Sequence, residues 1–124
     1  MANKTIQLSD GTNNLYPIVS QEYSTTTIEN STYGNFEAIK IGNLVYAHPS
    51  TMLTNIPTSW QTIGTLPEKF RPIQTIPYAT LVCQTDSSIV LLVGIFASGN
   101  INVRAFKNNT SGWFNDYVLF PVAS

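Results

Sequence analysis

A chain of 124 residues, with a mass of 13.7 kDa, fits one domain whose core buries roughly two thirds of the unfolded chain's surface. Charged residues make up only 10% and the net charge is −1, which excludes a basic footprint for duplex nucleic acid and a long charged disordered tail. The longest apolar run, residues 89–97, is too short to cross a bilayer, so we expect no membrane insertion.

The first 35 residues are polar and hold few apolar anchors. Such a stretch cannot bury enough surface by itself to offset an ordering entropy of about 1–2 kcal/mol per residue. Residues 1–35 are therefore predicted to form an arm or attachment segment that orders against the rest of the chain or against other copies. No positively charged start with an apolar stretch follows Met1, so Sec-type secretion is not signalled and synthesis in a cytoplasm is expected.

Short stretches rich in β-branched and aromatic residues fill residues 36–124, and glycines and prolines separate them. Gly42-Asn43 is a dipeptide that suits a two-residue hairpin turn, because both residues tolerate a positive φ. The expected strands are residues 36–41, 44–47, 60–63, 78–84, 89–97, 101–107 and 116–122.

The periodicity of these stretches predicts how they are covered. Residues 101–105 alternate strictly between apolar and polar, which predicts one buried face and one face toward solvent or a partner. Residues 89–93 are apolar on both faces, which predicts a strand covered on both sides. With no sustained helical period, the sequence predicts an all-β, antiparallel β-sandwich or jelly-roll-like head of seven to eight short strands over residues 36–124.

Motifs of enzymes and metal sites are missing from the sequence. His48 is the single histidine, and Cys83 stands alone in an apolar segment, where it is expected to be a small buried hydrophobe. The seven carboxylates fall in no telling local pattern, and there is no phosphate-binding glycine motif or Gly-x-Ser-x-Gly. We therefore expect a non-enzyme with no metal and no cofactor.

The polar segment 108–117, NNTSGWFNDY, is the best candidate for a ligand site. Aromatic rings beside amides and hydroxyls are typical of carbohydrate sites, where a flat ring stacks on a sugar and polar groups bond its hydroxyls. The alternative is that an aromatic residue here is a lid over one end of the core. The candidate ligand-binding residues are Trp113, Tyr117, Arg104, Asn115 and Asp116, with Arg104 placed on the polar face of the preceding strand.

Several stretches taken together resemble a known family. They are IKIGNLV at 39–45, WQTIGTLPEKFRP at 60–72, VGI at 93–95, SGNI at 98–101, and the aromatic residues Trp113, Phe114 and Tyr117. Their order resembles the head domains of bacteriophage tail-fibre and receptor-binding proteins of Gram-positive phages and prophages. The resemblance covers about two thirds of the chain, and Leu66-Pro67 to Arg71-Pro72 is its most specific part. Shared positions such as Trp60 and Phe70 are expected to pack as framework residues, with the prolines fixing the crossing between sheets.

The resemblance implies a virion protein, made in the host bacterial cytoplasm, whose homotrimeric head binds bacterial surface saccharide. The polar arm would then contact other virion proteins. The alternative is a structural virion protein without receptor binding, such as a capsid head fibre, a decoration protein or a baseplate subunit. An enzyme that degrades a surface polymer is a third, weaker hypothesis.

Overall fold

The computed structural model describes residues 5–9, 15–19 and 23–123, and side chains from Tyr23 onward. Within these residues the fold is all-β: the strands pair antiparallel throughout, and the one helical element is a short 3₁₀ turn, η1 (Glu68–Phe70). The strands are β1 (Thr5–Ser9), β2 (Leu15–Val19), β3 (Tyr23–Ile28), β4 (Phe36–Ile41), β5 (Leu44–Pro49), β6 (Leu53–Ile56), β7 (Gln61–Thr65), β8 (Ile76–Val82), β9 (Val90–Ile95), β10 (Asn100–Ala105), β11 (Thr110–Gly112) and β12 (Val118–Pro121).

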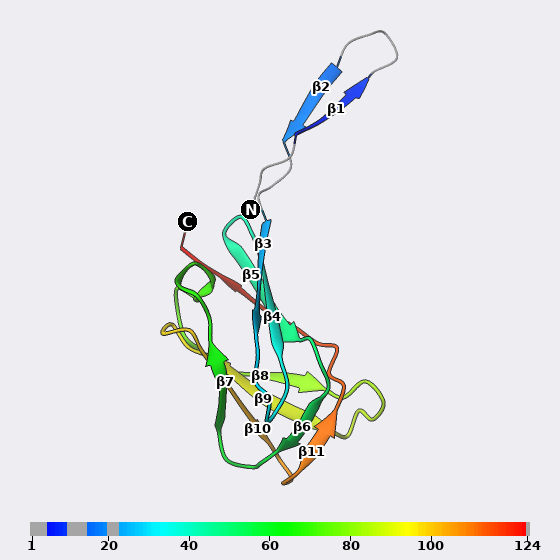
Figure 1. Ribbon diagram of the computed structural model, residues 1–124, viewed down its shortest axis with the longest axis vertical. Coiled ribbons are helices and arrows are strands. Elements are labelled where there is room, and N and C mark those ends of the chain that lie inside the picture. The colour runs from blue at the N-terminus through cyan, green and yellow to red at the C-terminus, as the bar shows by residue number, and fades with distance from the viewer. Residues whose placement is uncertain (1–4, 10–14, 20–22, 124) are drawn as a thin grey trace.

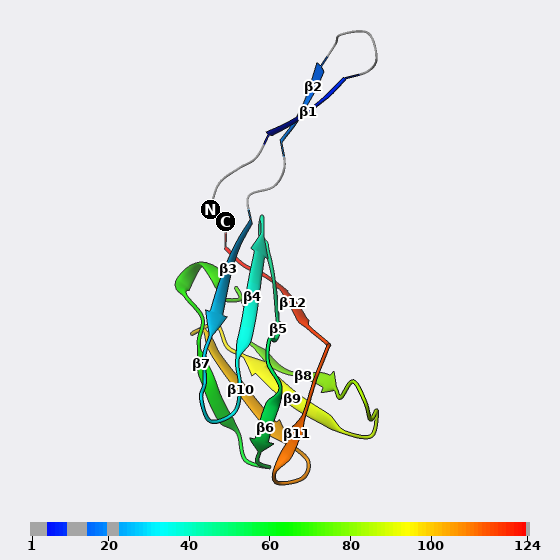
Figure 2. The ribbon, with the colours of Figure 1, turned by 45° about the vertical axis from the view of Figure 1, so that its right-hand side comes forward.

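Two four-stranded sheets form the body of the molecule. One has the order β7-β10-β9-β8 and the other the order β12-β5-β4-β3, while β11 with β6 and β1 with β2 form small two-stranded sheets. The strands of the first sheet run obliquely across those of the second (Figure 1), and the turned view separates the two layers (Figure 2). This layered, antiparallel arrangement agrees with the predicted β-sandwich.

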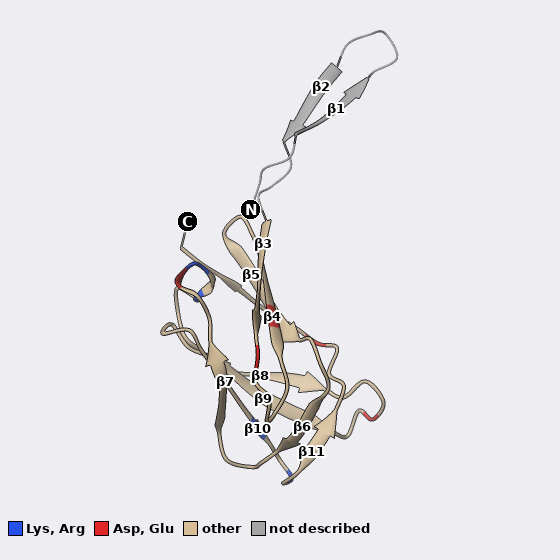
Figure 3. Ribbon diagram, in the orientation of Figure 1, with Lys and Arg blue, Asp and Glu red and all other residues tan. Residues whose placement is uncertain are grey.

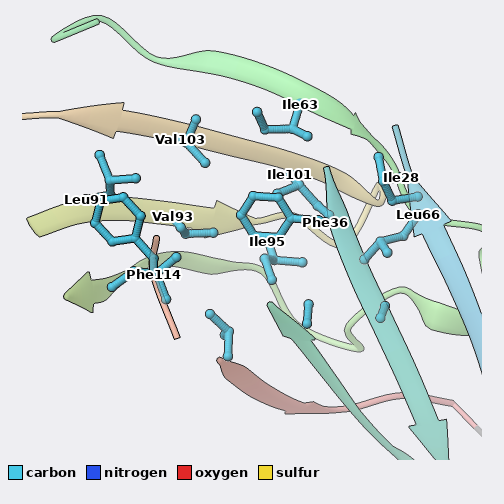
Figure 4. Packing of buried hydrophobic residues seen from close by; sticks show 14 of the residues in the cluster. Ile28, Phe36, Ile63, Leu66, Leu91, Val93, Ile95, Ile101, Val103 and Phe114 are labelled. Atoms are coloured by element: carbon cyan, nitrogen blue, oxygen red, sulfur yellow. The ribbon is translucent and has the colours of Figure 1, made fainter. Parts of the chain in front are cut away.

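The core lies between the two sheets and is built from alternate residues of their strands. Phe36 of β4 is fully buried and lies among Ile95 and Ile101 of the opposite sheet (Figure 4). The predicted alternation of β10 is confirmed, because Ile101, Val103 and Ala105 are buried while the two residues between them are partly exposed. Cys83 is buried in this core, as expected of a small hydrophobe.

Strand β9 corrects one prediction. Leu91 and Val93 are buried in the core, whereas Val90 and Leu92 on its other face are only half-buried. No second layer covers that face among the described residues, so the apolar side chains line an outer surface instead. The strand β9 is therefore apolar on both faces although only one face is covered by another layer of the described chain.

Local turn chemistry explains the hairpin between β4 and β5. Gly42 has a φ of 59°, which glycine adopts without strain, and β4 has the predicted bounds. By contrast, the strand expected over residues 60–63 begins at Gln61 and continues through Gly64 to Thr65. Gly64 lies inside β7 because a Cβ there would come within 2.3 Å of Ile28 Cγ2 on β3, so the glycine marks a close approach of the two sheets.

Five strands were not predicted: β1, β2, β3, β6 and β11. β3 belongs to the expected arm of residues 1–35, yet its residues pair with β4 along their whole length. β6 and β11 are four and three residues long and pair with each other across a register shift. The part of the chain from Phe36 onward therefore has nine strands instead of seven or eight. Most of the predicted arm falls on residues 1–22, of which only two short strands lie within the described residues.

The Leu66–Pro72 element ties the two sheets together at one end. Leu66 is fully buried, its N–H donates to Gly99 O at 2.8 Å, and Arg71 Nε donates to Leu66 O at 3.0 Å. Phe70 is buried as expected, and Pro72 forms an isolated bridge with Val122. The motif most specific to the resemblance is thus part of the framework of the sandwich.

Candidate functional site

The aromatic segment before β12 divides its residues between core and solvent. Phe114 is buried, and so fills the role of a lid over the core, whereas Trp113 is half exposed. Asn115 is exposed, and Asn108 at the start of the segment accepts hydrogen bonds from the N–H and hydroxyl of Thr58 at 2.9 and 3.2 Å. Trp113 and Asn115 therefore remain available to a ligand, while Asn108 is engaged in the fold.

The next two residues of this segment have contacts with different sheets. Asp116 Oδ2 accepts a hydrogen bond from the N–H of Val82 on β8 at 2.8 Å. The Tyr117 ring lies edge-on to Tyr46 of β5, with 5.7 Å between centroids, and is 62% exposed. Trp113, Asn115, Asp116 and Tyr117 thus share one connecting segment along the edge of the sandwich.

Arg104 lies elsewhere, on the outer face of the sheet β7-β10-β9-β8. It pairs in register with Leu92 of β9, and its guanidinium carbon lies 6.0 Å from the Trp60 ring centroid and 5.6 Å from that of Phe106. These are distances at which a cation is attracted to an aromatic face. The structure therefore does not join Arg104 to the other four candidate residues.

Trp60 corrects a second prediction. It was expected to pack as a framework residue, but it is 41% exposed and lies outside the core. Trp60 directly precedes β7, whose core-facing position is taken by the buried Ile63. The indole therefore lies on the outer face of the sheet, where it contacts the guanidinium of Arg104.

A hollow of about 460 Å³ opens on this outer face, in the size range of small-molecule sites. Leu92 of β9 lines it together with aromatic rings from three different segments. The lining residues are Trp60, Pro77, Tyr78, Leu92, Phe96, Asn102 and Arg104.

The amide and the charged side chain of this hollow both come from β10. Thr62 Oγ1 donates to Asn102 Oδ1 at 2.8 Å, which orients the amide and leaves its N–H groups toward other acceptors. Arg104 Nε is buried and has no hydrogen-bond partner among the described residues. An arginine side chain presents five N–H donors and is permanently charged, so the hollow combines aromatic faces with a cationic donor group.

A second hollow of about 650 Å³ lies beside the first, between the 85–89 turn and residues 106–111. Phe106 lines it and also lies against the guanidinium of Arg104, so the two hollows adjoin. Asp86 lines the second hollow, and hydrogen bonds from the hydroxyl and N–H of Ser88 hold the pKa of this carboxyl below its ordinary value. Asn109 there adopts a φ of 61°, a conformation that asparagine tolerates.

Neither hollow is lined by the titratable groups His48, Glu37 and Cys83. His48 Nε2 lies 3.1 Å from Glu37 Oε1, and the His48 ring stacks on Tyr46 at the outer face of β5. No group of three metal-ligating side chains comes together among residues 23–123. Thr85 lowers the pKa of the Cys83 thiol through hydrogen bonds to the sulfur, but the thiol lies in the core.

Comparison of the chain with models of known protein families gives no match, and comparison with curated proteins gives no significant match. Within the described residues, no helix has both the length and the apolar character needed to span a bilayer. Figure 3 shows that charged residues are sparse on both sheets, so the chemistry of the surface comes from aromatic and amide groups.

Most of the hollow was missed by sequence reasoning. Arg104 was named, but Trp60, Tyr78 and Phe96 belong to segments that only the sheet order brings together. One sequence signal could have indicated part of the hollow, namely that β9 is apolar on both faces. When β9 pairs with β10, its outward-facing Leu92 lies beside Arg104 on the same face of the sheet.

Proposed function

We propose that the chain is a bacteriophage virion fibre protein whose trimeric head binds carbohydrate on the bacterial cell surface. The observation that carries the proposal is the hollow on the outer face of β7-β10-β9-β8, where aromatic rings lie beside the amide of Asn102 and the guanidinium of Arg104. Rings of this kind stack on the apolar C–H face of a sugar, and the polar groups bond its hydroxyls.

Association of copies is supported by the outer face of the other sheet, and the number three comes from the resemblance to fibre heads. Leu44, Ile41 and Tyr23 are cross-strand neighbours there and are each more than 40% exposed. Leu119 and Tyr46 are paired in register in the adjoining row of the same face. Contiguous exposed apolar residues on a soluble domain mark an interaction surface. Three copies would raise a weak site affinity by a factor of about 10²–10⁴ when several sites engage at once.

The chain offers two exposed tryptophans for a matched test of the site. Trp60 lines the hollow, and Trp113 belongs to the segment before β12. We expect the purified protein to bind bacterial polysaccharides on a glycan array and to bind host cells. Trp60→Ala should weaken binding about tenfold or more through the loss of ring stacking, and Trp113→Ala should leave it unchanged.

Two results would contradict this proposal in different ways. Absence of binding to the correct host and to its polysaccharides contradicts adhesion. If Trp113→Ala loses binding and Trp60→Ala keeps it, the ligand site is not the hollow but the Trp113–Tyr117 segment. Circular dichroism and thermal unfolding of both variants provide the control for folding.

The second candidate is a structural virion protein without receptor binding. The exposed apolar face around Ile41 and Leu119 favours it as well, because such a face also suits packing against another virion protein. Immunogold labelling on intact particles separates the two candidates: an adhesin is expected at the tail, and a head fibre or decoration subunit on the capsid.

A further inference from the structure

The charge of Arg104 is the unusual feature of the hollow. Among the described residues the ion pair that forms is between His48 and Glu37, and no carboxylate pairs with Arg104. Asp86 lines the adjoining second hollow, where its Oδ1 accepts from the N–H and the hydroxyl of Ser88. Arg104 is therefore a cation held without a counter-charge from residues 23–123.

The surroundings of the guanidinium make this arrangement costly without a ligand. Its Nε is buried without a hydrogen-bond partner among the described residues, and the neighbouring groups are the rings of Trp60 and Phe106. A buried donor that lacks a partner carries its full desolvation cost, and aromatic faces compensate a cation only in part. Nε itself is covered, so an anionic group arriving in the hollow would pair with the Nη groups of the guanidinium and neutralise its charge.

We propose that the hollow selects an anionic sugar, in which a pyranose ring lies against the aromatic side chains and a carboxylate or phosphate pairs with Arg104. This inference rests on the proposed carbohydrate binding and specifies the class of ligand. The ring of the sugar contacts Trp60 and Tyr78, and the Asn102 amide donates to a hydroxyl. Stacking against Trp60 and Phe106 orders the guanidinium in advance, so little entropy is lost on pairing.

A neutral sugar fits the hollow less well. It fills the space beside the rings but supplies no charge to Arg104, so its hydroxyls replace water without neutralising the cation. A wholly apolar occupant would leave the Arg104 and Asn102 donors without acceptors. Charge complementarity therefore favours an anion over either alternative.

The test uses three soluble probes and the full chain. Methyl glucoside is the neutral probe, methyl glucuronide has the same ring with a carboxylate, and glucose 6-phosphate has the phosphate. The chain has two tryptophans, so the two indole N–H signals in a ¹⁵N NMR titration report separately on the hollow, at Trp60, and on a site outside it, at Trp113. We expect at least one anionic probe to shift the Trp60 signal with an affinity about tenfold or more above that of methyl glucoside.

Substitutions then test whether the preference for anionic over neutral probes depends on the charge of Arg104. Arg104→Gln should bring the anionic and neutral probes to equal affinity, while Lys69→Gln, which removes the same charge from the exposed η1 turn, should preserve the preference. Added salt should weaken only the anionic probes. Light scattering of Arg104→Gln should give the mass of the unsubstituted protein.

Each remaining outcome counts against a specific claim. Equal affinity of neutral and anionic probes for the unsubstituted protein overturns the anionic preference and leaves carbohydrate binding intact. A Trp60 signal that no probe and no host polysaccharide moves overturns both proposals. A change of oligomeric mass in Arg104→Gln overturns the ligand site, because it makes the hollow an interface between copies.

Discussion

Individual side chains in this protein are oriented mainly by short polar partners instead of ion pairs. Asn30 Oδ1 accepts from the N–H groups of Thr32 and Tyr33, and its own amide donates to Ile63 O of β7. Asp86 plays the same part in the turn before β9, where it accepts from both donors of Ser88. A composition rich in Asn, Ser and Thr thus supplies local hydrogen bonds at turns, where such side chains bond nearby backbone groups.

The Asp86 turn should depend on pH. The Ser88 hydroxyl, and then its N–H, lower the pKa of Asp86 in the folded state. The stabilisation is therefore present above the unfolded-state pKa and is lost as the pH falls through the lower folded-state value. An NMR titration of the carboxyl should give a pKa below the ordinary aspartate value, and Ser88→Ala should raise it; an unchanged pKa in Ser88→Ala would refute the assignment.

Among the elements, β3 and β7 bring the two sheets into close approach at Gly64 and Ile28. A Cβ on Gly64 would come within 2.3 Å of Ile28 Cγ2, so glycine is required there by the neighbouring strand and not by a turn. This contact joins an N-terminal strand to the opposite layer. Ile28 is the one buried residue of the polar strand Tyr23–Ile28. Its contact with Gly64 therefore helps to hold this strand against the opposite sheet.

Substitution of Gly64 tests this contact. Gly64→Ala should lower the free energy of unfolding by about 1–3 kcal/mol, because the added methyl group overpacks the contact with Ile28. Urea unfolding measures the change. In an Ile28→Ala background the further cost of Gly64→Ala should be close to zero, since the clashing methyl is gone. Equal costs in the two backgrounds would show that the contact is not responsible.

For the whole molecule, the two sheets present different outer faces. One has the hollow with Arg104, and the other exposes neutral apolar side chains such as Ile41 and Leu119. We assign the first to ligand and the second to other copies, since a permanent cation is costly to desolvate in an interface without a partner charge.

The proposed trimer makes this assignment testable. Light scattering at micromolar concentration should give three times the chain mass of 13.7 kDa. Ile41→Lys together with Leu119→Lys should shift the mass toward the monomer, because lysines on this face repel one another and resist burial. Thr80→Lys on the exposed face of β8 is the control and should leave the trimer intact. A monomer from the unsubstituted protein would contradict the assembly.

Sequence patterns predicted the elements better than their contacts. The bounds of β4 and the hairpin at Gly42 follow from local alternation and turn chemistry, which act within a few residues. β6 and β11 were missed because strands of four and three residues carry too few positions to show a period. Trp60 was misassigned because propensity does not say which face of a sheet an aromatic ring occupies.

Local patterns in the chain were enough to indicate an antiparallel β protein with little charge and a core of alternating apolar residues, because period and composition are properties of neighbouring positions. The grouping of Trp60, Leu92 and Arg104 on an outer face, apart from Trp113 and Tyr117, is visible in the fold alone. The reason is that pairing of β10 with both β7 and β9 sets these neighbours, and pairing order between distant strands is not written in any local stretch of the chain.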